Sequence, residues 1–515
     1  MPKRNYNVFF HLHTISGIII SVALFIMFFC GAFALFKDEI TAWEKGIPVN
    51  MEKALDIDYD RVIKTIKEEG YTLKGRDIRF TMPDAKQKML VVLNPSKIET
   101  APEAEKKSVY FNINTRNYKI STYYKFYSIG ELIYRLHFFS QIPRIGYYLS
   151  GLIAFFFLLA IVTGVIIHWK KIIPNFYTFR PKSKFKTIWT DAHTALGVIG
   201  LPFQFMYALT SCILCLTALI LVPLNFLYNG QQQKVYEEVR PAFKNYEWVA
   251  ETNASIPSLN TYVVKAEKKW AGFTPTQIFI KNYKGQNMKF QVDGLLDAQH
   301  GLFSNGRMIF DGITGAVIAE KNPKENTYTE AVEIAIRRLH FGDFGGLFLK
   351  TIYFILALIT CFVILSGVLI WLVARDKKHI DARKRKFNRG LGYFYIALCM
   401  SLYPVIAANM LVAKIIPRTL DDERKTILYS SFFITWLLVT LIFSFRKNNY
   451  LTTKYTLLIG SALGFAIPII NGFFSGNWMW KMYAENQTEI LLVDILWLIL
   501  SIISISILFR TKKPS

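Results

Sequence analysis

The chain has 515 residues, of which 52% are hydrophobic and 15% aromatic, and its formal net charge is +24. This apolar fraction is too high for an ordinary soluble protein of that length, which excludes a soluble enzyme or a soluble binding module. The positive charge does not indicate a nucleic-acid partner. The Lys and Arg residues cluster beside apolar runs, where membrane insertion and anionic lipid headgroups account for them.

Eight apolar runs follow one another, at residues 15–36, 146–167, 196–227, 347–373, 391–412, 427–445, 455–474 and 490–509. Each is close to or above the length of about 20 residues that an α-helix needs to cross a bilayer. Lipid offers the backbone no hydrogen-bond partners, so each run is expected to be helical. The predicted fold class is a mainly α membrane protein with eight transmembrane helices, in which a four-helix core precedes four C-terminal helices.

Basic residues collect at every second loop, at 3–4, 170–186, 375–389, 446–454 and 510–513. Positively charged flanks stay in the cytoplasm, so both termini are predicted to be cytoplasmic in a multi-pass protein of the bacterial inner (cytoplasmic) membrane. The predicted order is a first helix in 1–37, a periplasmic domain in 38–135, a second helix in 136–170, a basic loop in 171–190, a third helix in 191–227, a second periplasmic domain in 228–337, a fourth helix in 338–375, a second basic loop in 376–390 and the C-terminal helices in 391–515.

Both long segments between spans mix helical and strand patterns. The first predicts a helix over 59–69 and strands over 88–93 and 109–113, and the second predicts a helix over 259–269 and strands over 277–280, 288–292, 308–311 and 316–319. Two small α+β domains are therefore expected. Their sequences contain no acid pair, nucleophile triad or metal-ligand cluster, which leaves both a structural cap and a ligand-binding role open.

An internal repeat places the histidines. The pattern H-T-x-x-G begins at His13 and again at His193, and R-L-H-F occurs at 135–138 and at 338–341. The first 375 residues are thus two parallel copies of one unit made of a helix, an exported domain and a helix. Equivalent residues of parallel copies lie at equal depth. His13 and His193 are expected together near the cytoplasmic face, and His137 and His340 near the outer face.

Paired histidines on facing helices are what a six-coordinate haem requires, because its two axial ligands approach from opposite sides. The predicted haem-iron ligands are His13 with His193 and His137 with His340, and His168 is an alternative ligand at the inner site. No C-x-x-C-H occurs, so both haems are expected to be non-covalent haem b. Arg135 and Arg338 precede the outer histidines and are expected to contact either haem propionates or lipid headgroups.

These motifs, together with Thr163 to His168, Phe176 to Pro181 and Asp191 to Gly197, resemble the PepSY-associated transmembrane proteins. That family of bacterial iron-regulated membrane proteins includes haem-containing ferrisiderophore reductases. The resemblance implies a four-helix core with two haems that passes electrons outward to siderophore-bound ferric iron. It also implies that the exported α+β segments are PepSY modules. The four C-terminal helices depart from the smallest members of the family, and they contain no histidine.

The function expected from these patterns is electron transfer from a cytoplasmic donor, through two haems, to a ferric siderophore or other ferric chelate in the periplasm, as a haem-dependent ferric reductase. The alternative is a non-catalytic membrane protein, either a conduit for siderophore or iron or a scaffold with partner-binding modules. Pro202 and Pro223 interrupt the third span, as a conduit with broken helices would require.

Overall fold

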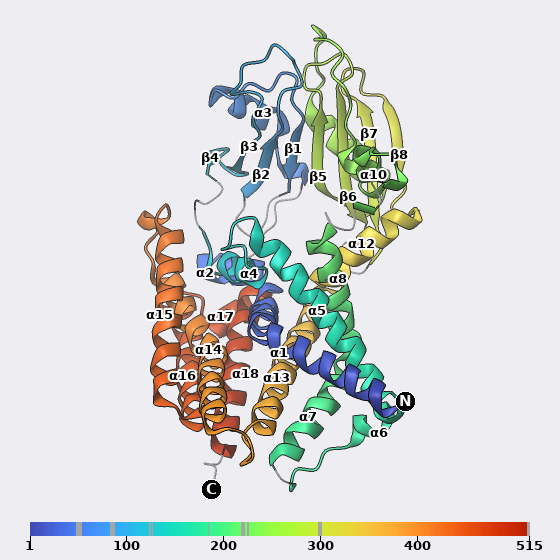
Figure 1. Ribbon diagram of the computed structural model, residues 1–515. Helices are drawn as coiled ribbons and strands as arrows, with labels where there is room; N and C mark the ends of the chain where they lie inside the picture. The colour runs from blue at the N-terminus through green and yellow to red at the C-terminus, as the bar shows by residue number, and fades with distance from the viewer. Residues whose placement is uncertain are drawn as a thin grey trace. The chain divides into compact units, whose positions relative to one another are not determined.

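A computed structural model describes residues 1–47, 54–82, 88–122, 125, 127–183, 185–217, 222–223, 226–296 and 301–511. The chain divides into two compact units (Figure 1). The helical unit comprises Met1–Pro48, Phe126–Ala218 and Lys350–Ser515, and the sheet unit comprises Val49–Lys125 and Leu219–Leu349.

The helical unit is built from long apolar helices joined by short polar ones. Seven helices are long and apolar enough to cross a membrane, or eight if one bent pair counts as a single span, within the described ranges. The elements are α1 (Lys3–Ala34), α2 (Lys37–Lys45), α4 (Ile129–His137), α5 (Ile145–His168), η2 (Trp169–Lys171), α6 (Ile172–Tyr177), α7 (Phe185–Ile199), α8 (Leu201–Cys215), α13 (Gly346–Ala374), α14 (Ala382–Ile415), η5 (Arg418–Leu420), α15 (Arg424–Arg446), α16 (Asn449–Ser475), α17 (Met479–Ala484) and α18 (Thr488–Arg510).

The third span differs from its prediction. Instead of one helix over 196–227, the chain forms α7 and α8, which meet at a 68° bend beside Gly200. Pro202 has no N–H to continue the helical hydrogen bonds across the bend. The Gln204 amide takes the space beside Gly200, 2.6 Å from where a Cβ would stand. Residues 218–221 and 224–225 of the predicted span lie outside the described residues.

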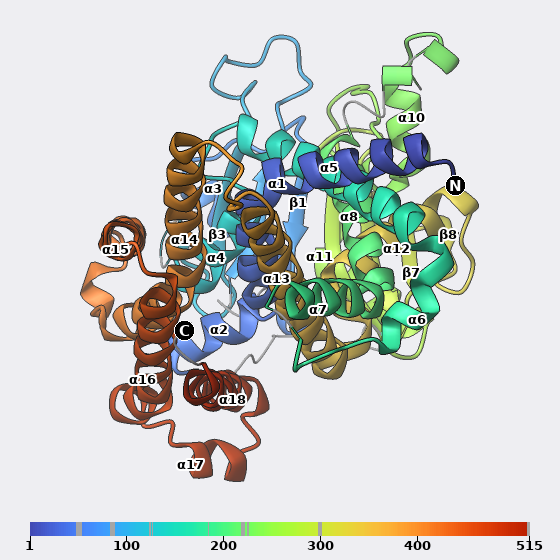
Figure 2. The same ribbon diagram turned by 60° about the horizontal axis from the view of Figure 1, so that its bottom comes forward.

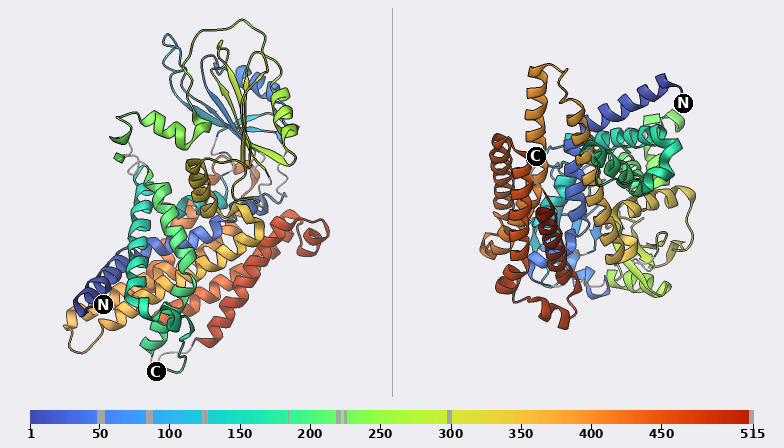
Figure 3. Two further views of the ribbon diagram at one scale, coloured as in Figure 1. Left: turned by 90° about the vertical axis from the view of Figure 1, so that its right-hand side faces the viewer. Right: turned by 90° about the horizontal axis from the view of Figure 1, so that it is seen from below.

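Helix packing separates a core from a C-terminal bundle. In the core, α1 packs against α4 and α5, and α5 packs against α8. Figure 2 shows α7 beside α13. In the bundle, α14 packs against α15 and α16, and α16 packs against α18. These orange and red helices group together in the right-hand view of Figure 3. Gly460 and Gly464 let them approach, because a Cβ at either position would collide with Tyr403 or Ser501.

The sheet unit is one continuous sheet, which differs from the two separate domains that the sequence predicts. Eight antiparallel strands run in the order β4-β3-β2-β1-β5-β6-β7-β8, so β1 of the first segment pairs with β5 of the second, with Ile78 opposite Ile280. The elements are η1 (Ala54–Asp56), α3 (Tyr59–Glu68), β1 (Ile78–Thr81), β2 (Lys88–Leu93), β3 (Val109–Asn114), β4 (Ile120–Ser121), α10 (Gln232–Val239), η3 (Pro241–Phe243), α11 (Leu259–Lys269), β5 (Phe273–Lys281), β6 (Lys289–Leu296), β7 (Asn305–Asp311), β8 (Val317–Lys321), α12 (Tyr328–Phe341) and η4 (Asp343–Gly345).

The two halves of the sheet unit share one hydrophobic core, and α3 and α11 supply its helical side. Each helix caps the other. The backbone N–H of Tyr59 donates to Asn260 Oδ1 and the N–H of Leu259 donates to Asp60 Oδ1, both at 2.8 Å. These reciprocal bonds satisfy the first amide of each helix. Such exchange is possible only when the halves fold as a single body.

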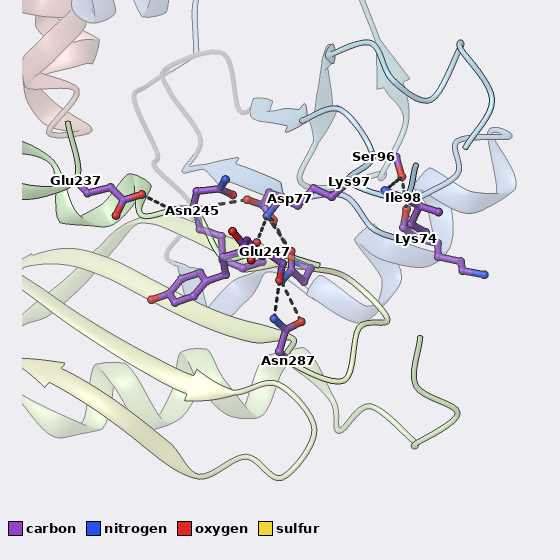
Figure 4. A network of polar contacts seen from close by, with 12 residues as sticks. Lys74, Asp77, Ser96, Lys97, Ile98, Glu237, Asn245, Glu247 and Asn287 are labelled. Carbon is purple, nitrogen blue, oxygen red and sulfur yellow. Dashed lines mark hydrogen bonds and ion pairs between the residues drawn. The ribbon is translucent and has the colours of Figure 1, made fainter. Parts of the chain in front are cut away.

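A polar network also joins the halves where β1 meets β5 (Figure 4). The Lys97 ammonium donates to Asp77 Oδ1 at 2.8 Å in the first half, and to Asn282 Oδ1 at 2.8 Å and the Tyr246 carbonyl at 2.7 Å in the second. Burial lowers the pKa of nearby Lys281, although Asp77 partly opposes this effect. The junction is therefore tied by charge-assisted hydrogen bonds as well as by strand pairing.

Candidate functional site

His13 of α1 and His193 of α7 lie close together in the helical unit. Their ring centroids are 6.3 Å apart and the ring planes are inclined by 73°. His13 Nδ1 lies 2.8 Å from the Ala160 carbonyl of α5, and His193 Nδ1 lies 2.9 Å from the Val363 carbonyl of α13. An Nδ1–H that donates to a carbonyl leaves the Nε2 lone pair available for a metal. The two copies of the repeat thus present equivalent imidazoles to one place.

Glycines shape the contact of each ring with the neighbouring helix. A Cβ on Gly164 would stand 3.2 Å from the His13 ring, and a Cβ on Gly367 would stand 3.1 Å from the His193 ring. Each of these glycines follows the carbonyl that accepts the Nδ1–H bond by one helical turn. A larger residue would push the ring away from that carbonyl. The ring contact therefore accounts for the glycine at position 164 in the first copy and at position 367 in the second.

A cavity of about 480 Å³ adjoins the two rings. Gly17 and Gly197, the glycines of the two H-T-x-x-G motifs, both line it and have nothing within 4 Å of an added Cβ. They lie one turn after His13 and His193 and keep that side of each helix bare. Apolar side chains from α1, α5, α7 and α13 form most of the wall: Ile18, Ile20, Leu24, Phe157, Ile161, Val165, Val198, Ile364 and Val368. The cavity suits a large, mostly apolar group.

Further polar side chains line the same cavity. His168 is one of them, and its Nδ1 lies 3.2 Å from the Asn175 amide. Its repeat counterpart, Trp371, lines the cavity from the second copy. Arg375 stands over the Trp371 ring, 4.2 Å from the centroid, and donates to the Trp371 carbonyl. His11 also reaches the cavity. Arg375 thus supplies a cation to the lining of the cavity.

His137 repeats the same arrangement at another place in the helical unit. Its Nδ1 lies 2.6 Å from the Met27 carbonyl, and a Cβ on Gly31, one turn later, would stand 2.7 Å from the ring. Burial lowers the pKa of the His137 imidazole, which favours the neutral ring. Three of the four predicted histidines therefore lie against a glycine and face a carbonyl one turn before it.

The sequence placed His137 and His340 at the starts of the second and fourth spans, whereas in the structure His137 is the last residue of the separate helix α4 and His340 lies one residue before the end of α12. His340 belongs to α12 of the sheet unit, so its pairing with His137 stays a prediction. Arg135 donates to Glu131 at 2.7 Å, and Arg338 donates to Asp343 at 3.1 Å. Both arginines thus have carboxylate partners within their own units, and contact of either with a propionate stays a prediction.

A comparison with protein families identifies a family for most of the chain. The model of the PepSY-associated TM region matches residues 10–374. The chain belongs to the PepSY-associated transmembrane family. The family match covers both copies of the repeat and ends before α14, so α14 to α18 are an addition to the family core. Among curated proteins, none matches this chain in sequence.

Sequence reasoning missed several residues of this PepSY-associated transmembrane core. The carbonyls of Ala160 and Val363 carry no side-chain signal, and Arg375 was counted only among the basic residues of a loop. The repeat contained a usable signal for the glycines, because Gly164 and Gly367 occupy equivalent positions, as do Gly17 and Gly197. No group of three or more His, Cys, Asp or Glu side chains that could hold a bare metal ion occurs in the part of the chain that the structure describes.

Proposed function

We propose that this protein holds two haems of the b type in its family core and moves electrons across the bacterial inner membrane to reduce ferric iron bound to a siderophore. Both termini face the cytoplasm in this proposal, so the His13–His193 site is the inner one. Haem, when bound, supplies reversible one-electron chemistry at its iron. Reduction lowers the charge on the chelated iron, which weakens its attraction to anionic oxygen donors and favours release.

The spacing of His13 and His193 carries the proposal. A metal–nitrogen bond of about 2 Å plus a ring radius of about 1.2 Å on each side places the centroids of two imidazoles that share one metal about 6.4 Å apart. The observed separation is 6.3 Å. The donor set also fits haem iron, because both ligands are imidazoles whose Nδ1 atoms face carbonyls.

The remaining residues of the inner site have distinct parts in this proposal. Gly17 and Gly197 leave room for a macrocycle beside the ligands, and the apolar wall excludes water from it. Arg375 balances the charge of a propionate. The carbonyls of Ala160 and Val363 fix the orientation and basicity of the two rings. His137 is the proposed ligand of the second haem, with His340 as its partner.

An optical spectrum of the full chain in detergent tests the proposal. We expect sharp low-spin α and Soret bands after dithionite reduction and two haems per chain by pyridine haemochromogen assay. The reduced protein should then reoxidise when a ferric hydroxamate chelate is added, with ferrous iron trapped by a ferrous-specific chelator. A colourless preparation from haem-replete cells would overturn the proposal.

The bend between α7 and α8 favours a second candidate, a non-catalytic conduit for iron chelates. Discontinuous helices mark substrate sites in many transporters, and the bend places Gln204, only 4% exposed, against the cavity. Vesicles that contain the protein distinguish the two functions. A conduit would take up a radiolabelled ferric chelate without a reductant even after His13 and His193 are replaced by alanine, whereas a reductase would not.

A further inference from the structure

The C-terminal helices, which lie beyond the family match, supply buried polar side chains to the short helix α2. Asp494 of α18 accepts a hydrogen bond of 2.7 Å from the Trp43 indole N–H, and Asn471 of α16 donates to the other oxygen of Asp494 at 3.0 Å. The Lys414 ammonium of α14 donates to the Trp43 carbonyl and lies 4.6 Å from its ring centroid. Trp43, Asp494 and Asn471 are completely buried. Two helices of the bundle, α14 and α18, therefore contact Trp43 directly, and α16 supports the contact through Asp494.

The remaining long helix of the bundle, α15, contacts Glu44, the next residue of α2. Arg424, at the start of α15, donates from Nε to Glu44 at 3.0 Å and also donates to the Ala413 and Ile416 carbonyls at the end of α14. The Arg424 and Glu44 side chains are 2% and 0% exposed. Together with Lys414 and Asp494, this cluster contains two cations and two anions. Buried charges are tolerated when they are paired and hydrogen-bonded in this way.

Glu44 connects the bundle to α4. Its Oε2 accepts from the backbone N–H of Ile129 at 2.8 Å, the first amide of α4. Thr41 of α2 donates to the hydroxyl of the α4 N-cap, Ser128, at 3.0 Å. A Cβ on Gly130 would stand 2.6 Å from the Lys37 carbonyl, so only glycine permits this approach of the two helices. A carboxylate at a helix N-terminus is also stabilised by the positive end of the helix dipole.

The other end of α4 carries His137, whose ring contacts Met27 and Gly31 of α1. Because α4 is only nine residues long, its N-terminal tie to Glu44 fixes the direction from which His137 reaches α1. We propose that the C-terminal helices act as a brace, in which the Arg424–Glu44 and Asp494–Trp43 contacts hold α2 and α4 and thereby position the His137 ring. The assignment of His137 as a haem ligand rests on the proposed function, whereas the brace does not depend on it.

The test uses the full chain in detergent with the double substitution Glu44→Gln and Arg424→Met. Removing both charges leaves neither Glu44 nor Arg424 as an unpaired buried ion, and Asp421, which lies 4.0 Å from Arg424, is 22% exposed, so the variant should fold. We expect the backbone amides of α4 to exchange hydrogen at least tenfold faster than in the unsubstituted chain, with α5 and α7 unchanged. In a His13→Ala background, where only the second haem is held, the reduction potential and the low-spin spectrum of that haem should shift.

The matched control is Ser401→Ala with Thr440→Val, which removes a buried hydrogen bond of 3.0 Å between α14 and α15 that does not touch α2. It should leave α4 exchange and the haem spectrum unchanged. If the double variant fails to fold, Trp43→Phe, which removes the bond to Asp494 and part of the buried ring, should raise α4 exchange by a smaller factor. Unchanged α4 exchange, or an equal rise in α1, α4 and α5, would overturn the brace. A colourless unsubstituted protein would instead overturn the proposed function and leave the exchange result to decide the brace.

Discussion

In the first copy of the repeat, His13 lies on α1, an unbroken helix of 32 residues, whereas in the second copy His193 lies on α7, which ends at a 68° bend. The rings nevertheless make the same contacts. Each faces the carbonyl one turn before a glycine of the next core helix. The helix that carries the histidine can therefore be straight or bent, provided that the ring keeps its contacts with the carbonyl and the glycine and still borders the cavity.

The largest expected effect comes from removing either imidazole. His13→Ala and His193→Ala should each reduce the haem content from two to one per chain, because a six-coordinate site needs both ligands. The double variant should lose no more than either single one. Pyridine haemochromogen assays of purified protein measure this. Full haem content in either single variant would show that the two copies do not share one site.

Filling the cavity from either copy should have nearly the same effect without harming the fold. Gly17→Leu or Gly197→Leu places a side chain where nothing lies within 4 Å of the Cβ, so no clash arises. Leucine also favours the helix over glycine by up to about 1 kcal/mol. We expect the inner haem to be lost while the thermal unfolding temperature of the haem-free protein is unchanged or higher. Retention of both haems in these variants would contradict the assigned cavity.

A smaller effect should distinguish the two copies. Ser366 and its counterpart Thr163 both donate to the carbonyl that faces the histidine, which is Val363 in one copy and Ala160 in the other, but Ser366 Oγ also lies 3.1 Å from His193 Nδ1. Ser366→Ala removes a hydrogen bond worth about 0.5 to 1 kcal/mol, which corresponds to about 20 to 40 mV for a one-electron couple, so the inner potential should rise by up to that amount. Thr163→Ala should leave it unchanged. Redox titration of both variants measures the difference, and equal shifts would contradict it.

The smallest effect is expected at His168, where the second copy has Trp371 in place of the histidine. His168→Trp introduces the residue that the second copy has at Trp371, and it should leave the haem content at two per chain if His13 and His193 are the ligands. The absorption spectrum of the reduced protein provides the readout. Loss of one haem in this variant would make His168 the ligand of the inner site in place of His13 or His193.

Sequence patterns predicted the features that depend on local rules. The helix over 259–269 and the strand over 88–93 were placed at the bounds that the structure has, because periodicity reports which face is buried. The meeting of His13 and His193 followed from the repeat. The family match to residues 10–374 confirms the suspected family.

Long-range features left no such signal. The bend at Gly200 had a signal in Pro202, but its angle of 68° had none, and β1, a short strand, has no long periodic run of its own. The merging of the two segments of the sheet unit depends on pairing between residues about 200 positions apart. Buried charges such as Arg424 and Asp494 look like ordinary loop or interfacial residues until their partners are known.

The pairing of β1 with β5 has a consequence for biosynthesis. A ribosome that adds about 5 to 20 residues per second needs about 10 to 40 seconds to make the residues between Ile78 and Ile280. Throughout that interval β1 has an open hydrogen-bonding edge, of the kind that recruits foreign strands. The first segment of the sheet unit therefore stays without its partner strand β5 during this interval. Any delay in inserting α7 and α8 lengthens the time for which its open edge is exposed to aggregation.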